Sequence, residues 1–271
     1  MSKYNHMMSI PVESVPEEEI ETAIKEWAEG NEPLERLLKE CYKRGIRTNG
    51  CHGKVNPYID FIYQDNLERI NSLFKVIETT PNSQVLVSVD GSNPYSGPEW
   101  DKSVIDFSLY TKYKDEADSF FDSLKEALKE DKTEINNPFY DLLYFFQNKE
   151  SGLQFRFMNV DNNKYDFIVE SFKLEDRYSY FNKLFTESGL KEIKTDHPRY
   201  YWGITSNDLS TIKEKIEDVS KYIIKNYNFE APQKEEDIKN FHLLARYKKK
   251  NMSEEDFYEW LDNERKNNFV L

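Results

Sequence analysis

The segment Leu153–Phe172, LQFRFMNVDNNKYDFIVESF, consists of two runs rich in aromatic and β-branched residues on either side of Asp161-Asn162-Asn163. Runs of this composition favour β-strands, and a short polar turn between two of them is the signal for a β-hairpin. The segment therefore predicts two antiparallel strands, LQFRFMNV and KYDFIVESF, and with them a β-sheet in the second half of the chain.

The residues after this hairpin predict further helices and strands. A helix that ends at Gly189 has four apolar residues on one side, namely Tyr180, Phe181, Leu184 and Phe185. Strands are expected near 190–195 and 199–205. In the second of these, Tyr200 and Trp202 share one face and Tyr201 has the other, because successive strand side chains alternate. A long helix then has five apolar residues on its inner side: Leu209, Ile212, Ile216, Val219 and Ile223.

The first half of the chain repeats this order. A strand over Tyr58–Tyr63 is expected to face the core with Ile59 and Phe61, and a helix begins near Asp65. Strands at 83–89 and 103–111 and one more helix complete the unit. Because no residue-level repeat accompanies it, this is a repeat of topology. We therefore predict an α+β fold of two modules, each an antiparallel sheet with helices on one face.

Helical elements are expected at both ends of the chain. Residues 1–15 are predicted to be a flexible arm, followed by an N-terminal module over 16–137 and a C-terminal module over 138–231. A helical hairpin opens the first module, and its apolar positions are Ile20, Ala23, Ile24 and Trp27, then Leu34, Leu37, Leu38, Cys41 and Tyr42. Gly45 fits a left-handed C-cap of the second helix. Two polar helices are expected in 232–271, the last one capped by Ser253.

The chain of 271 residues has 50 acidic and 37 basic side chains and a formal charge of −13. Such a field repels phosphate backbones at long range, which argues against duplex nucleic acid and anionic membranes as partners. There is no run of 18 apolar residues and no signal-peptide core, so we expect a cytoplasmic protein. Cys41 and Cys51 are too few for a disulfide framework. A homo-oligomer is left open.

Sequence motifs of several enzyme classes are missing. The chain has no P-loop, no G-x-G-x-x-G, no H-E-x-x-H and no G-x-S-x-G. The four histidines lie far apart in sequence, and no metal site is expected from them. In a chain with this many carboxylates, close acidic pairs arise by chance. We therefore assign no catalytic residue, no metal and no cofactor.

The stretch RGIRTNGCHGKVN, residues 44–56, permits two interpretations. As a ligand-binding loop, its three glycines would expose backbone amides, and Arg47 and Lys54 would attract an anion such as a nucleotide phosphate. Cations nearby would lower the thiol pKa of Cys51, and His52 would serve as an acid or base. As a structural element, it is a glycine cap followed by a turn into the next strand. The second interpretation is favoured.

The same stretch shows the pattern Gly-Ile-x-Thr-x-x-Cys-x-Gly-Lys. It resembles a loop in uncharacterised bacterial and phage proteins. More distantly, it is similar to the Ser-Ser-Cys-Ser-Gly-Arg loop of the wybutosine-synthesis tRNA methyltransferases. Cys51 and Gly53 match that motif, Gly50 and His52 replace serines, and Lys54 replaces arginine. The resemblance implies an α/β domain that binds S-adenosylmethionine and RNA, but the charge of the chain argues against RNA.

The connection Asp90–Lys102, DGSNPYSGPEWDK, is longer than most loops between strands, and long loops are often functional. Tyr95 and Trp100 are large amphipathic groups of the kind that anchor protein interfaces. From these features and the net charge we expect a non-catalytic protein that binds a protein with a basic surface, as an inhibitor or immunity-type factor does. The alternative is an enzyme that binds a nucleotide or S-adenosylmethionine through residues 44–54.

Overall fold

The computed structural model describes residues 17–62, 70–88, 104–130, 138–146, 153–161, 164–172, 175–195, 199–229, 244, 247–248 and 251–268. Its strands are β1 (Thr48–His52), β2 (Tyr58–Ile62), β3 (Ser83–Ser88), β4 (Val104–Leu109), β5 (Leu153–Asp161), β6 (Lys164–Phe172), β7 (Lys191–Ile193) and β8 (Arg199–Ser206). Its α-helices are α1 (Ile20–Trp27), α2 (Glu32–Lys43), α4 (Phe74–Thr79), α5 (Lys114–Ala127), α6 (Pro138–Phe146), α7 (Glu175–Glu187), α8 (Leu209–Asn226) and α10 (Glu254–Asn268). Short 3₁₀ turns, Glu17–Glu19 and Asn71–Leu73, precede α1 and α4.

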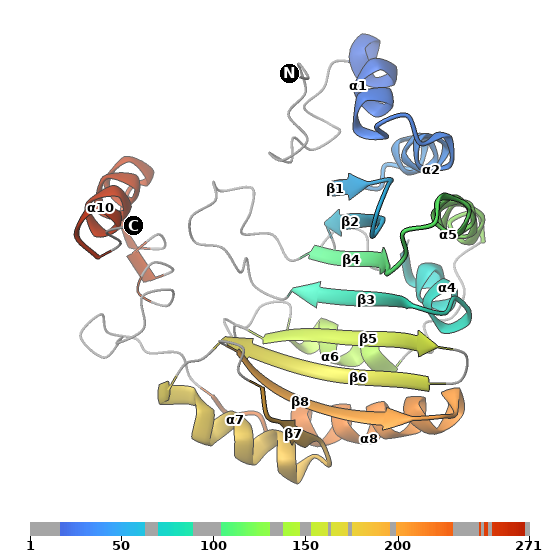
Figure 1. Cartoon of the computed structure of the whole chain (residues 1–271). Helices are drawn as coiled ribbons and strands as arrows, with labels where there is room; N and C mark the ends of the chain where they lie inside the picture. Colours follow the sequence, from blue (N-terminus) through green and yellow to red (C-terminus); the bar gives the residue numbers. More distant parts are fainter. Residues whose placement is uncertain are drawn as a thin grey trace.

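The eight described strands form one antiparallel sheet in the order β1-β2-β4-β3-β5-β6-β8-β7. Figure 1 shows them side by side, from β1 at the top to β7 at the bottom. The first four strands and the last four have the same internal order. In each set the first strand pairs with the second, the second with the fourth, and the fourth with the third. Strand β3 of the first set pairs with β5 of the second, so both halves share one continuous sheet. The α+β architecture and the repeated topology are thus confirmed.

The core lies on one face of this sheet. Inward side chains alternate along each strand, for example Ile59 and Phe61 on β2 and Phe155 and Phe157 on β5, and all four are buried. Phe139 of α6 packs edge-on against Phe155, with ring centroids 6.5 Å apart. Helices α4 and α7 reach the same face through the ring contacts Phe74–Phe107 and Phe185–Trp202. Aromatic side chains therefore fill the layer between sheet and helices, and each buried one contributes about 1.5–3 kcal/mol.

The helical hairpin at the start of the chain is held by Asn31. Its side-chain oxygen accepts a hydrogen bond from Leu34 N at 2.8 Å, which caps α2. The amide nitrogen donates to the carbonyl of Gly53 and to Asp118 Oδ1, both at 2.9 Å. One buried side chain thus connects α2 with the β1–β2 turn and with α5.

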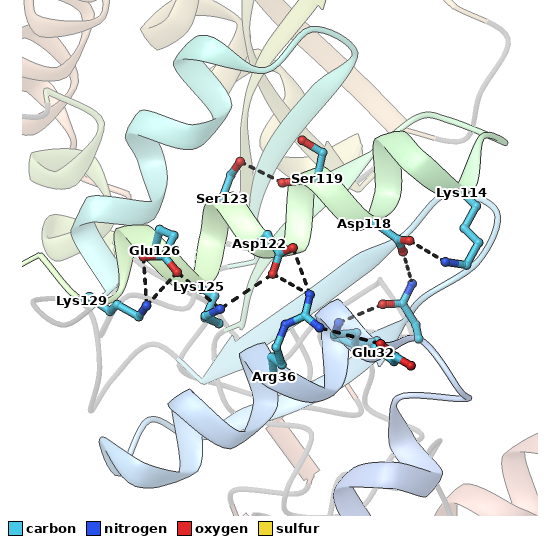
Figure 2. Close-up of polar contacts among 12 residues, drawn as sticks. Glu32, Arg36, Lys114, Asp118, Ser119, Asp122, Ser123, Lys125, Glu126 and Lys129 are labelled. Carbon is cyan, nitrogen blue, oxygen red and sulfur yellow. Dashed lines mark hydrogen bonds and ion pairs between the residues drawn. The ribbon is translucent and has the colours of Figure 1, made fainter.

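Helices α2 and α5 lie side by side and are joined on their outer surfaces by ion pairs (Figure 2). Arg36 of α2 donates to both carboxylate oxygens of Asp122 at 3.0 Å. Just after the end of α5, Lys129 pairs with Glu126 of the helix at 2.7 Å. Exposed pairs of this kind each contribute only about 0.2–1 kcal/mol, so the apolar stripes beneath them supply most of the association.

Three expectations need correction or restriction. Residues 48–52 are a strand, not a turn, because their backbone pairs with β2 around a bulge at Gly50. Tyr42 is 38% exposed and does not belong to the buried stripe of α2. The expected arm, residues 1–15, lies outside the described residues, as does most of the predicted helix before α10.

Several predicted details are confirmed. Gly45 has a φ of 64° after α2, and Gly189 has a φ of 101° after α7, so both helices end on a left-handed glycine. Ser253 Oγ accepts from Asp256 N at 3.2 Å at the start of α10. On β8, Trp202 is buried against α7, while Tyr201 belongs to the opposite face. Within the described residues, no helix has the length and apolar composition needed to cross a membrane.

Replacing Asn31 with alanine should lower the free energy of unfolding by about 2–3 kcal/mol, because a helix cap and two buried hydrogen bonds are lost together. Urea denaturation followed by circular dichroism measures this. Asn226→Ala is the matched control, since Asn226 makes a single exposed hydrogen bond within α8. Equal losses in the two variants would contradict the connecting role of Asn31.

Candidate functional site

The face of the sheet opposite the core carries the candidate site, which we call the polar face. Strand alternation places on it the side chains that lie between the buried apolar positions. They include Tyr58 and Asp60 on β2, Asp106 and Ser108 on β4, Gln84 and Ser88 on β3, Gln154 and Arg156 on β5, Glu170 on β6, and Arg199 and Tyr201 on β8. Helices α4, α6 and α7 cover the other side of the sheet, and several side chains of the polar face, Gln84, Gln154 and Glu170 among them, are themselves buried.

Two copies of the tripeptide Ile-Asp-Phe set the centre of the polar face. Residues 59–61 lie on β2 and residues 105–107 on β4, and the antiparallel register places Asp60 directly opposite Asp106. Their apolar neighbours, Ile59 and Phe61 among them, are fully buried on the core side. The two aspartates must therefore both point to the polar face, where cross-strand partners lie about 4.5–5.5 Å apart at Cβ.

The two carboxyl groups titrate as a pair. Burial raises the pKa of Asp60 well above its ordinary value, and the charge of Asp106 and the hydrogen bond between the two groups raise it further. Burial also raises the pKa of Asp106, while the hydrogen bonds from Asp60 and Ser108 and the charge of Arg156 act in the opposite direction. Like charges this close disfavour double ionisation. The shared proton therefore belongs to Asp60, which donates it to Asp106.

A second charged group lies on β5, β6 and β8. The Glu170 side chain is only 1% exposed and accepts from Arg156 at 3.0 Å and from Arg199 at 3.2 Å, one on each carboxylate oxygen. Arg199 also donates to Gln154 Oε1 at 2.7 Å, and Gln154 donates to Ser88 Oγ at 2.9 Å. Two guanidinium groups are thus fixed by one buried carboxylate. Removing one partner of such an ion pair would destabilise the fold, because the other charge would stay buried without a partner.

Two buried polar atoms near the centre lack a hydrogen-bond partner among the described residues. They are Gln84 Oε1 and Arg156 Nε. Gln84 donates through its amide nitrogen to Ser108 Oγ, and that hydroxyl donates to Asp106. Buried polar atoms are nearly always hydrogen-bonded in folded proteins. Their position beside the aspartate pair marks this part of the face as unusually polar for its burial.

Tyrosines border the same region. Burial and the charge of Asp60 raise the pKa of Tyr58 to about 12, so its hydroxyl stays protonated at neutral pH. Tyr110 is 46% exposed, and burial raises the pKa of its hydroxyl while the nearby charge of Arg156 opposes the shift. Exposed tyrosines beside fixed charges are frequent in protein interfaces, because the ring adds apolar contact and the hydroxyl a hydrogen bond.

The residues considered for a ligand-binding loop at 44–54 are not gathered into one site. Cys51 faces the core on β1 with 5% exposure, and its Sγ lies 3.7 Å from the carbonyl oxygen of Trp27. Burial raises the pKa of this thiol, which is the opposite of the lowering that neighbouring cations would cause. The thiol is therefore protonated at neutral pH and not poised as a nucleophile. Cys41 is also a free, buried thiol.

His52 and Lys54 lie instead at the edge of the sheet, beside Glu29 of the turn between α1 and α2. His52 Nδ1 is 3.1 Å and Lys54 Nζ 3.9 Å from Glu29 Oε2. His52 is the cross-strand partner of Tyr58, so it borders the polar face from β1. Arg47 precedes β1 and is not among the residues that line the hollow formed by this turn. Tyr95 and Trp100 lie outside the described residues.

Sequence reasoning missed the polar-face residues for a definite reason. Close pairs of carboxylates were attributed to the acidic composition of the chain. In each predicted strand, only the side chains that face the core were considered. The repeated Ile-Asp-Phe was the available signal, since an acid between two inward apolar residues must point to the other face. It would have pointed to Asp60 and Asp106. The partners Arg156, Glu170 and Arg199 depend on pairing between distant strands, which no local pattern gives.

Comparisons with protein-family models, with curated proteins and with solved structures found no match. No cluster of three or more histidine, cysteine, aspartate or glutamate side chains suited to a metal ion occurs in the described part of the chain. The function of the site therefore has to be argued from its own chemistry.

Replacing Asp60 with asparagine should stabilise the protein increasingly as pH rises. The pKa of Asp60 is higher in the native state than in the unfolded chain. At pH values between these two pKa values, the native state therefore binds a proton that the unfolded chain has lost. Stability of the wild type accordingly falls through that window by up to about 1.4 kcal/mol per pH unit. Asparagine cannot ionise but still donates to Asp106, so the variant avoids this loss.

Urea denaturation of wild type and Asp60→Asn from pH 4 to pH 9 measures the difference. Asp218→Asn, at an exposed position of α8, is the control and should give a constant offset. Parallel stability profiles for wild type and Asp60→Asn would show that the carboxyl group is not destabilised in the native state.

Proposed function

We propose that the protein acts by binding another protein through the polar face of its sheet, and that the Asp60–Asp106 pair receives a cationic side chain of the partner. A single observation carries the proposal: two carboxyl groups face each other on a half-buried sheet surface and have raised pKa values. An arginine or lysine between them would allow both to ionise, which the isolated protein disfavours.

The surroundings of the pair suit a protein partner. The face is broad, since polar side chains extend over β2, β4, β3, β5, β6 and β8. It carries fixed donors on Arg156 and Arg199, acceptors on the aspartates, and tyrosine rings at its border. Interfaces combine such anchors with a polar rim, and charge complementarity sets the choice of partner and the rate of association.

The charge of the whole chain supports a basic partner. With a formal charge of −13, the protein attracts basic surfaces at long range, and the aspartate pair then supplies a specific contact. A protein of this kind would cover a basic functional surface of its partner, which is how an inhibitor or immunity-type factor acts. We therefore place the protein in that class.

The alternative of a nucleotide- or S-adenosylmethionine-dependent enzyme has weaker support. It relied on residues 44–54 as an exposed glycine-rich loop, whereas Thr48–His52 are a paired strand and Cys51 faces the core. The aspartate pair has an acid and a base side by side, but neither residue belongs to the stretch 44–54 on which that alternative depends.

Binding of a basic partner should release a proton and strengthen with pH. Below the native pKa of the pair the proton competes with the incoming cation, and above it the carboxylates are free to accept the cation. The dissociation constant should therefore fall as pH rises through that pKa, and Asp60→Asn/Asp106→Asn should weaken binding at least tenfold.

The test begins with wild type, Asp60→Asn/Asp106→Asn and the control Asp141→Asn/Asp218→Asn, each immobilised and exposed to soluble proteins of the host. Both double variants remove two negative charges, but the two control positions are exposed, on α6 and α8. A partner should be retained by wild type and control and lost by the polar-face variant. Its affinity is then measured with purified proteins at several pH values and salt concentrations. A partner whose affinity is the same for both doubles would contradict the proposal.

A further inference from the structure

A second surface feature lies at the β1–β2 turn, where three separate segments meet around a hollow of about 270 Å³. The α1–α2 turn contributes Glu29, Gly30 and Asn31, and the β1–β2 turn contributes Gly53, Lys54 and Val55. The connection from β4 to α5 contributes Lys112, and the first residue of α5 contributes Lys114. We call this feature the lysine hollow.

The lysine hollow has a local charge opposite to that of the chain. Three lysines and one glutamate line it, whereas the protein as a whole carries −13. Lys54 lies 3.9 Å from Glu29 and Lys114 lies 2.5 Å from Asp118, and the charges of Asp115 and Glu32 also act on Lys114. Figure 2 shows Lys114 at the start of α5 beside Asp118. Among the described residues, no carboxylate forms an ion pair with the exposed Lys112. The lining of the hollow itself therefore has two more basic than acidic side chains, and the exposed Lys112 is the basic group available to a ligand.

The walls of the hollow are built rigidly. Asn31 is 5% exposed and its three hydrogen bonds connect the segments that carry the lysines. Gly53 packs so closely that a β-carbon there would lie 2.7 Å from Asn31 Cβ, so the β1–β2 turn approaches the helical hairpin without a side chain between them. Asn56 N donates to the carbonyl of Thr111 at 2.8 Å, which ties the turn with Lys54 to the connection with Lys112.

We infer that the lysine hollow binds a small phosphate-bearing molecule through Lys54, Lys112 and Lys114. A lysine ammonium group binds phosphate oxygens as a compact point charge, and three such groups line the hollow. The volume is just below the usual range of about 300–1,000 Å³ for ligand pockets, so it fits a phosphate group with a small attachment. Val55, 58% exposed, offers an apolar surface for that attachment.

This site differs from the earlier expectation for residues 44–54. Of the residues named there only Lys54 takes part, and its two companions come from residues 112 and 114, which are distant in sequence. The inference does not depend on the proposed function of the polar face, because neither aspartate of the pair lines the hollow.

Isothermal titration of the full-length protein with inorganic pyrophosphate tests the inference, with inorganic phosphate and citrate as companion probes. We expect saturable binding of pyrophosphate that is at least tenfold tighter than binding of citrate and weakens with salt. Lys54→Ala/Lys112→Ala should weaken the binding of pyrophosphate at least tenfold. Both side chains are exposed, so thermal unfolding should show the variant to be folded.

The control is Lys75→Ala/Lys221→Ala, which removes two exposed lysines with 58% and 69% of their side chains accessible, far from the hollow in sequence. It should bind pyrophosphate as the wild type does. Absence of saturable binding to the wild type would overturn the inference. So would citrate binding as tight as that of pyrophosphate, or an equal loss in the two double variants.

Discussion

The alternation of side chains across the paired strands β2 and β4 is the constraint on which the candidate site depends. Ile-Asp-Phe occurs in both strands, and the register places each aspartate against the other while the apolar residues on both sides enter the core. A slip of one residue in either strand would move its buried side chains to the polar face, at a cost of several kcal/mol. The hydrophobic core thus forces two carboxyl groups together, although their mutual repulsion opposes it.

The polar face and the lysine hollow divide the charges of an acidic chain into two regions of different character. On the polar face, Glu170 fixes two arginines and the aspartates share a proton, so the charges are arranged and partly withdrawn from water. In the hollow, Lys54 of the β1–β2 turn lies near Lys112 and Lys114 around the start of α5, and the hydrogen bonds of Asn31 connect these segments. Both regions lie beside β1 and β2, with His52 and Glu29 between them.

Much of the fold could be predicted from the sequence because strand composition and helical spacing are local signals. The strands around Asp161, the helix ends at Gly45 and Gly189, and the repeated order of elements follow from such patterns. β1 was missed because its residues, Thr48–His52, include a glycine and polar groups that are weak strand formers. They become a strand only through pairing with β2.

The candidate site was less accessible to sequence reasoning. Its members come from β2, β3, β4, β5, β6 and β8, and their meeting depends on the strand order, in which β4 lies between β2 and β3. Cys51 and His52 are adjacent in sequence, which suggested a shared site, but strand alternation places their side chains on opposite faces of the sheet. The charge of the chain indicated the kind of partner without locating the surface that binds it.

The central claim, that Asp60 and Asp106 share a proton in the folded protein, is tested most directly by NMR titration of their side-chain carboxyl carbons. The account predicts that the two signals respond to each other and that Asp60 titrates well above the ordinary aspartate value of about 4. Independent titration of both groups near that ordinary value would contradict it.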